Sequence, residues 1–277
     1  MPNLEELDVS DSSFNEVPLS SSSVLRKLNL SNTRIKDLNY SDQAMLEELD
    51  ISGCNELETI TLSNCPKLKS LTIPQSVKKV FIGNCPGMES IYAEYQGSQI
   101  MISNLVSVII SACPGLKYIN LNNQNNQELE ISLVGATGLE TLQLARILTR
   151  NITFPAKSNW NSLKELNLSG SSIGSFNYDN TVNVDYLDLR HFENLEYINL
   201  SENKNVIGVR CPNIQGQPVK LVAGAFAECG GLQYLYGNFE VTGTRVFINC
   251  SNLTLNPSRI YSQYPVLQYP VPFINDE

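Results

Sequence analysis

The sequence contains one histidine, His191, and therefore one imidazole that can act as a general base near neutral pH. It stands in the segment 189–192, with no serine or cysteine nucleophile motif attached to it. The chain also lacks the phosphate-binding glycine loop, the H-E-x-x-H zinc motif and the G-x-S-x-G elbow. Adjacent carboxylates such as Glu5 and Glu6 point to opposite faces of a strand, so they cannot form a catalytic pair. We therefore predict a protein that is not an enzyme and that uses no cofactor and no metal ion.

Seven cysteines raise two further kinds of chemistry, a disulfide scaffold and a metal cluster. No two of them form a C-x-x-C pair, and an odd count leaves at least one thiol unpaired. Neither kind of site is therefore favoured by the spacing. The cysteines are Cys54, Cys65, Cys85, Cys113, Cys211, Cys229 and Cys250.

The sequence contains a short repeat, which determines the strands on which His191 and the cysteines lie or to which they are adjacent. The segments 4–9, 25–30 and 46–51 share the template L-x-x-L-x-L and return at an interval of 21 residues. Many copies are followed about eleven residues later by another copy or half-copy, so each turn carries two short extended segments. Apolar and polar positions alternate as in a strand, and a turn buries its apolar row only when neighbours stack about 4.8 Å apart.

The repeat predicts a β-rich solenoid over residues 1–253, a single curved right-handed coil with few helices. The register slips by half turns at 74–105 and 121–160, and residues 127–132 fit the template poorly. From residue 254 to 277 the chain leaves the repeat, and four prolines there exclude a helix or a central strand. We expect this segment, rich in proline and tyrosine, to be a C-terminal cap.

The template resembles that of the leucine-rich repeat family, L-x-x-L-x-L-x-x-N/C, which Leu46, Leu49, Ile51 and Cys54 fill. Repeats of 21–23 residues with two leucine segments look like the short-repeat proteins of Bacteroides-type bacteria. The segment 224–232 is similar to the A-F-x-x-C-x-x-L stretch of the BspA-like group. The resemblance implies that most cysteines sit at the N/C position, where a thiol turns inward and can bond loop backbone. We accordingly expect all seven to be reduced.

The resemblance also implies a function: a non-catalytic recognition or adhesion module, secreted or on the cell surface, that binds a protein or glycan through its concave face. Two alternatives stay open. An intracellular, cytoplasmic scaffold for a protein partner would suit the reduced, odd number of cysteines. A polysaccharide-processing parallel β-helix enzyme would have coils of similar length, although the leucine three residues ahead of each strand argues against it.

Charge and hydropathy exclude other partners. The formal net charge is −9 and no run of lysine or arginine occurs, so we expect no nucleic-acid partner. No apolar stretch approaches the roughly 18 residues needed to span a bilayer, and no export signal opens the sequence, so we expect no direct membrane insertion. The first residues already look like the middle of a repeat, and an upstream segment is expected to have been removed. We expect a monomer.

The outward positions of the strands supply the candidate site. In the first turns Glu6, Lys27 and Glu48 alternate in sign, as in a ladder whose charges satisfy one another. Around 165–210 the corresponding positions change to tyrosine, arginine and isolated acids. Tyrosine and arginine are favoured at binding hot spots, and an aspartate beside two arginines can order both. The predicted partner-binding residues are Glu165, Tyr186, Asp188, Arg190 and Arg210.

Overall fold

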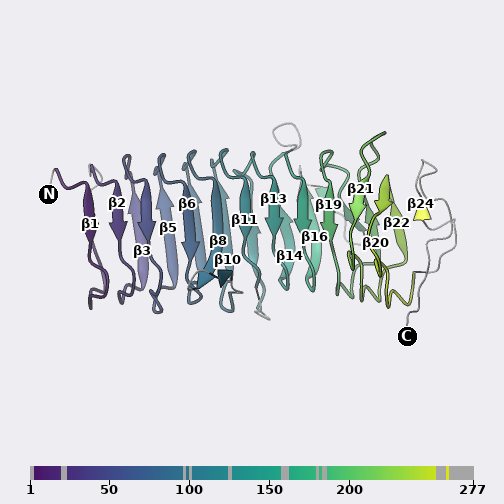
Figure 1. Ribbon diagram of the computed structural model, residues 1–277, viewed down its shortest axis with the longest axis horizontal. Helices are drawn as coiled ribbons and strands as arrows, with labels where there is room; N and C mark the ends of the chain where they lie inside the picture. Colours follow the sequence, from purple (N-terminus) through teal and green to yellow (C-terminus); the bar gives the residue numbers. More distant parts are fainter. Residues whose placement is uncertain are drawn as a thin grey trace.

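The chain winds as a parallel β-solenoid in which two rows of short strands form two layers (Figure 1). The computed structural model describes residues 3–19, 24–95, 98–99, 102–123, 127–156, 162–178, 181–182, 186–253 and 260–261. Over these residues the regular structure consists of strands and turns. Within the same ranges no helix is long and apolar enough to cross a membrane. The expected β-rich solenoid is confirmed at this level.

The first row of strands, which we name row A, consists of a three-stranded sheet (β1, β2, β4) followed by the sheet that runs from β6 to β23. Its strands pair in parallel, one from each successive turn. They are β1 (Glu6–Asp8), β2 (Lys27–Asn29), β4 (Glu48–Asp50), β6 (Ser70–Ile73), β8 (Ser90–Tyr95), β11 (Tyr118–Asn120), β13 (Thr141–Gln143), β15 (Glu165–Asn167), β19 (Tyr197–Asn199), β21 (Val219–Leu221) and β23 (Phe239–Val241).

The second row, row B, lies in the other layer. It consists of β3 (Asp37–Ser41), β5 (Thr59–Ser63), β7 (Lys79–Gly83), β10 (Ser107–Ser111), β12 (Glu130–Ser132), β14 (Leu148–Thr153), β16 (Ser172–Tyr178), β18 (Tyr186–Asp188), β20 (Gly208–Arg210), β22 (Tyr234–Tyr236) and β24 (Ile260–Tyr261). Two short strands, β9 (Ser98–Gln99) and β17 (Thr181–Val182), pair antiparallel with β8 and β16. The segments with irregular register thus resolve: 79–83 joins row B, and 127–132 contributes β12, which pairs with both β10 and β14.

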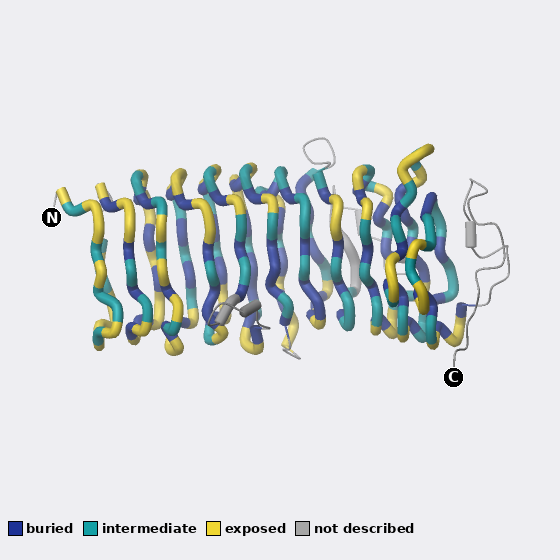
Figure 2. The backbone as a smooth tube through the Cα atoms, in the orientation of Figure 1, coloured by how far each residue is buried: buried dark blue, intermediate teal, exposed yellow. Residues whose placement is uncertain are grey.

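The apolar positions of both rows meet in one core between the layers. In row A, Leu71, Ile91, Ile119, Leu142 and Leu166 follow one another in register, and each side chain is at most 2% exposed. Figure 2 shows the resulting alternation of buried and exposed backbone along the strands. Since burying one leucine contributes about 1.5–3 kcal/mol, columns of this kind supply most of the stability of the stack.

Leu49 departs from the expected pattern, because its side chain is only partly buried. It lies in β4, at the edge of the three-stranded sheet, and the structure describes no ladder between β4 and β6. Leu49 is therefore less buried than Leu166, which holds the central position of β15 at 2% exposure.

The corners between the rows are shaped by residues with positive φ that stack from turn to turn. Asp42, Asn64, Asn84 and Ala112 have φ values of 57°, 55°, 50° and 49°. The amide of Asn64 donates to Asp42 Oδ1 at 2.6 Å, and the amide of Asn84 donates to Asn64 Oδ1 at 2.7 Å. Asparagine and aspartate tolerate this backbone conformation better than most residues, so their recurrence defines each corner.

All seven cysteines are buried as free thiols, as the resemblance implied. The thiol groups turn inward and donate to backbone carbonyls. Cys54 Sγ lies 3.1 Å from Leu30 O, and Cys250 Sγ lies 2.9 Å from Phe226 O. Each of these carbonyls also accepts a backbone N–H, from Thr33 and Cys229 respectively, so the thiol is a further donor that gives the buried Sγ atom a polar partner.

Candidate functional site

The five sequence-predicted residues fall on different rows. Asp188 of β18 lies directly opposite Arg210 of β20, and Arg190 follows β18 in the chain, so these three belong to row B. Glu165 lies in row A, where β15 pairs with β13 and β19. The side chain of Tyr186 falls outside the described residues, although its backbone pairs with Gly208. The expectation that Glu165 and Tyr186 stand in one column is therefore wrong.

The cause of this error is an antiparallel hairpin. Because a copy or half-copy of the template returns about every eleven residues, we expect the chain to pass from row B to row A between β16 and β18. Instead, β17 pairs back onto β16 through Asn177–Val182 and Tyr178–Thr181, and the chain returns to row B as β18. One turn thus contributes two parallel strands to row B and one to row A, and every later copy lies on the opposite row from the one expected.

Asp188 and Arg190 form the closest ion pair of the site. The Arg190 Nε atom lies 2.9 Å from Asp188 Oδ1 and 3.1 Å from Oδ2, and the second guanidinium nitrogen also bonds the carboxylate. The Asp188 side chain is 13% exposed, whereas that of Arg190 is 57% exposed. Burial alone would raise the pKa of Asp188, but the hydrogen bonds and charge of Arg190 outweigh it, so the pKa of this carboxyl is lowered. Asp188 therefore stays ionised and holds an exposed guanidinium in a fixed position.

Arg210 and two tyrosines continue the site along row B. The Arg210 guanidinium lies 6.0 Å from the ring centroid of Tyr236, its register partner on β22. The ring of Tyr234 stacks with that of Tyr236 at 6.2 Å with an interplanar angle of 17°. Cation–π contacts at exposed sites contribute about 0.5–1 kcal/mol, enough to favour one arrangement of these long side chains. We name the group Asp188, Arg190, Arg210, Tyr234 and Tyr236 the Tyr–Arg surface.

Tyr234 and Tyr236 were not predicted from the sequence. Their signal is the alternation Tyr-Leu-Tyr in 234–236, in which Leu235 is buried and both tyrosines are partly exposed. This segment follows Leu232 by the leucine spacing of the template, so it could have been counted as another copy.

In the N-terminal part of row A, charges of opposite sign alternate between neighbouring strands, as the sequence predicts. Glu6, Lys27 and Glu48 are consecutive register partners, and Lys27 Nζ lies 3.3 Å from Glu48 Oε1. The second column matches it, since the Asn29 amide donates to Asp8 at 3.1 Å. Lys27 thus pairs with Glu48, and Asn29 bonds Asp8, so neighbouring turns bind one another through these columns.

The Tyr–Arg surface presents charged and aromatic groups that can contact a partner. It offers an ordered guanidinium fork in the turn after β18, a second guanidinium on β20 and two tyrosine rings on β22. In the part of the chain that the structure describes, no group of three or more histidine, cysteine or acidic side chains is arranged to hold a metal ion.

The fold and this surface define a parallel β-solenoid with a tyrosine- and arginine-bearing face on one row of strands. No protein-family model matches the chain, and a search of the curated proteins found no match.

Proposed function

We propose that this chain is a non-catalytic recognition module of the leucine-rich repeat type, secreted or displayed on a cell surface, that binds a protein or glycan partner. The observation that carries the proposal is the Tyr–Arg surface, in which Arg210 packs over Tyr236 next to the Asp188–Arg190 pair. Tyrosine and arginine dominate binding hot spots because they combine large contact area with directed hydrogen bonds.

The surface is preorganised for a partner that presents carboxylates or paired hydrogen-bond acceptors. Arg190 is fixed by Asp188, and an arginine fork forms two parallel hydrogen bonds with a carboxylate. Asp188 lies on β18, and Arg190 lies in the turn directly after it and is held by Asp188, so binding costs little conformational entropy.

A binding screen against glycan arrays and surface proteins, followed by substitution, tests the proposal. Arg210→Ala together with Tyr236→Ala is expected to weaken binding of any partner found by about thirtyfold or more, as a hot-spot loss of 2 kcal/mol or more implies. The matched control changes Lys27 and Glu48 to serine, which removes an exposed ion pair of row A. Equal weakening by both pairs of changes would contradict the proposal.

An intracellular scaffold is the second candidate, favoured by one observation: all seven cysteines are free and buried. Reduced thiols are the rule inside cells. The nature of the partner separates the two candidates, because a scaffold would retain an intracellular protein and bind no glycan.

A further inference from the structure

The two rows of strands differ in number at one turn. In row A, β15 pairs directly with β19, with Glu165 opposite Tyr197. In row B, β18 is inserted between β16 and β20 and pairs with β20. Because neighbouring strands lie about 4.8 Å apart, row B is wider by one strand spacing than row A at this turn. The corner segments that lead from β15 to β16 and from β19 to β20 must therefore diverge.

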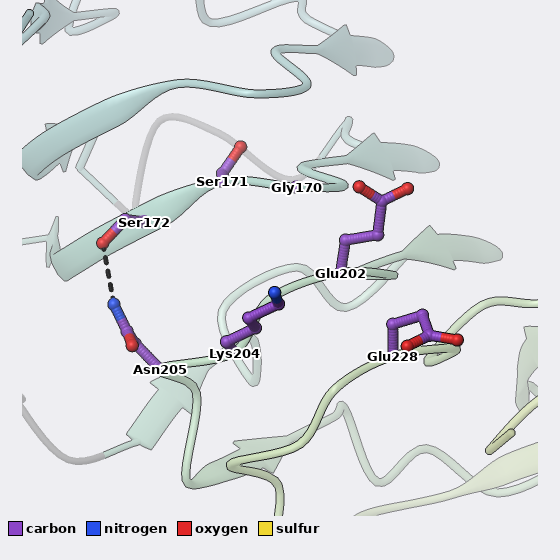
Figure 3. A pocket seen from close by; sticks show the side chains of 7 residues that line it. All are labelled: Gly170, Ser171, Ser172, Glu202, Lys204, Asn205 and Glu228. Carbon is purple, nitrogen blue, oxygen red and sulfur yellow. Dashed lines mark hydrogen bonds between the residues drawn. The ribbon is translucent and has the colours of Figure 1, made fainter. Parts of the chain in front are cut away.

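The hydrogen bonds trace this divergence. On the side of row A the corner is closed by backbone bonds, including Gly170 N to Ser201 O at 2.6 Å and Glu202 N to Ala227 O at 2.7 Å. Toward row B the two segments are joined by a side chain, since the Asn205 amide donates to Ser172 Oγ at 3.0 Å. The divergence leaves a cavity of about 520 Å³, which we name the corner cavity (Figure 3).

The lining of the corner cavity is polar and contains two carboxylates and one ammonium group. It includes Gly170, Ser172, Glu202, Lys204, Asn205 and Glu228. Arg146, which is not part of the lining, has its Nη2 atom 3.9 Å from Glu202 Oε2 and so pairs with one of the two carboxylates. The Ser171 hydroxyl is already engaged, because it donates to Leu144 O and accepts from Ile147 N. Figure 3 shows Ser172 and Asn205 on one side, the two glutamates on the other and Lys204 between them.

We infer that the corner cavity binds a neutral sugar, as one unit or a short neutral oligosaccharide. Its volume falls within the range of about 300–1,000 Å³ typical of small-molecule sites. The lining has no apolar or aromatic side chain to hold an apolar ligand, and the two glutamates repel phosphate and other anions. Carboxylates and an amide oxygen accept from vicinal hydroxyl groups, while Lys204 and the Asn205 amide donate to ring and hydroxyl oxygens.

This site lies apart from the Tyr–Arg surface and is tested separately. The ¹⁵N-labelled full chain is titrated with maltose, cellobiose, lactose and N-acetylglucosamine up to about 10 mM, which detects millimolar dissociation constants. At least one sugar is expected to cause saturable shifts of the backbone amides of Gly170, Ser172 and residues 202–205. If none of the four does so, the inference is wrong.

Substitutions locate the binding. Lys204→Met with Glu202→Gln is expected to weaken sugar binding tenfold or more, because each change removes a hydrogen bond to a charged group. The matched control makes the same two chemical changes at an exposed ion pair of row A, Lys27→Met with Glu48→Gln, and should leave binding unchanged. If the double variant does not fold, Lys204→Met alone repeats the test with the Arg146–Glu202 pair intact.

The inference is overturned if the cavity variant Lys204→Met with Glu202→Gln binds the sugar as tightly as the unchanged protein. It is also overturned if the control variant weakens sugar binding by the same factor. Arg210→Ala with Tyr236→Ala should leave sugar binding unchanged. Loss of sugar binding in that variant would place the sugar on the Tyr–Arg surface and would likewise overturn the inference, while leaving the proposed recognition function standing.

Discussion

At the scale of the residue, the buried thiols of Cys211, Cys229 and Cys250 are acids that the fold keeps neutral. Burial raises the pKa of Cys211 to about 12 and that of Cys229 to about 12, from an ordinary value of 9.0. Cys250 is raised to about 11 for the same reason. A neutral thiol can donate to a carbonyl, whereas a thiolate in the same place would be an unsolvated charge.

The free energy of unfolding should therefore fall at alkaline pH. Above pH 9 the unfolded chain loses thiol protons that the folded chain retains, so stability is fully present below pH 9 and is lost as pH rises toward 11–12. A fully buried thiol contributes a slope of about 1.4 kcal/mol per pH unit. Urea unfolding between pH 7 and pH 11 measures this slope. Cys211→Ala should make it shallower, and identical slopes in the two proteins would contradict the prediction.

A second prediction concerns the corner column of positive-φ residues. Asn64→Ala removes the hydrogen bonds to Asp42 and from Asn84 and places a methyl group in the left-handed conformation, so we expect a loss of about 1–3 kcal/mol. Asn64→Gly loses the same bonds without the steric cost and should be less damaging. Chemical denaturation of both variants measures the difference.

Ala112 provides the control for that prediction, because it already holds φ 49° in the same column. Ala112→Gly removes the steric strain of a Cβ atom at positive φ and breaks no side-chain hydrogen bond. The unfolded chain gains conformational entropy from the glycine, which partly offsets this stabilisation. It should be neutral or mildly stabilising. A clear loss in Ala112→Gly would mean that the φ values of this corner carry no strain.

At the scale of the element, the strands differ in how completely they bury their central leucine. Leu166→Ala should cost about 2–5 kcal/mol, because Leu166 is 2% exposed and has a register partner on both sides. Leu49→Ala should cost clearly less, about 1–2 kcal/mol, since that side chain is partly exposed already. Equilibrium unfolding of the two variants compares them directly, and an equal cost would show that the break between β4 and β6 is closed in solution.

The leucine template was sufficient to predict two strands per turn and most of their inward residues, and the family resemblance implied the inward thiols. The template failed at the one place described where the chain forms two successive parallel strands in row B, β16 and β18, without passing through row A. The hairpin pairing of Asn177 with Val182 leaves the spacing of the apolar residues unchanged. Hydrophobic periodicity alone therefore cannot reveal it. Asp188, Arg190 and Arg210 were correctly grouped because they lie beyond that hairpin together, whereas Glu165 precedes it. The corner cavity arises from a mismatch between rows, and no local pattern encodes such a mismatch.

At the scale of the whole molecule, each turn is stabilised only by its neighbours. The β1, β2 and β4 sheet is separate from the rest of row A, and Leu4, Leu7 and Val9 beside it are only partly buried. Its amides should exchange with deuterium at least tenfold faster than those of β7, β10 and β11, whose inward apolar residues are at most 2% exposed. Hydrogen exchange followed by mass spectrometry measures this gradient. Uniform protection along the coil would indicate that the molecule opens only as a whole.

The extra strand of row B has a consequence for how such proteins diversify. A duplication that adds one half-repeat and folds back, as the pairing of β17 with β16 does, leaves the downstream turns intact but exchanges the faces on which their strands are displayed. Residues selected on one side of the molecule are then presented on the other, beside new neighbours, without a single substitution. In a two-layered coil, therefore, recombination in units of half a turn is sufficient to transpose an entire surface.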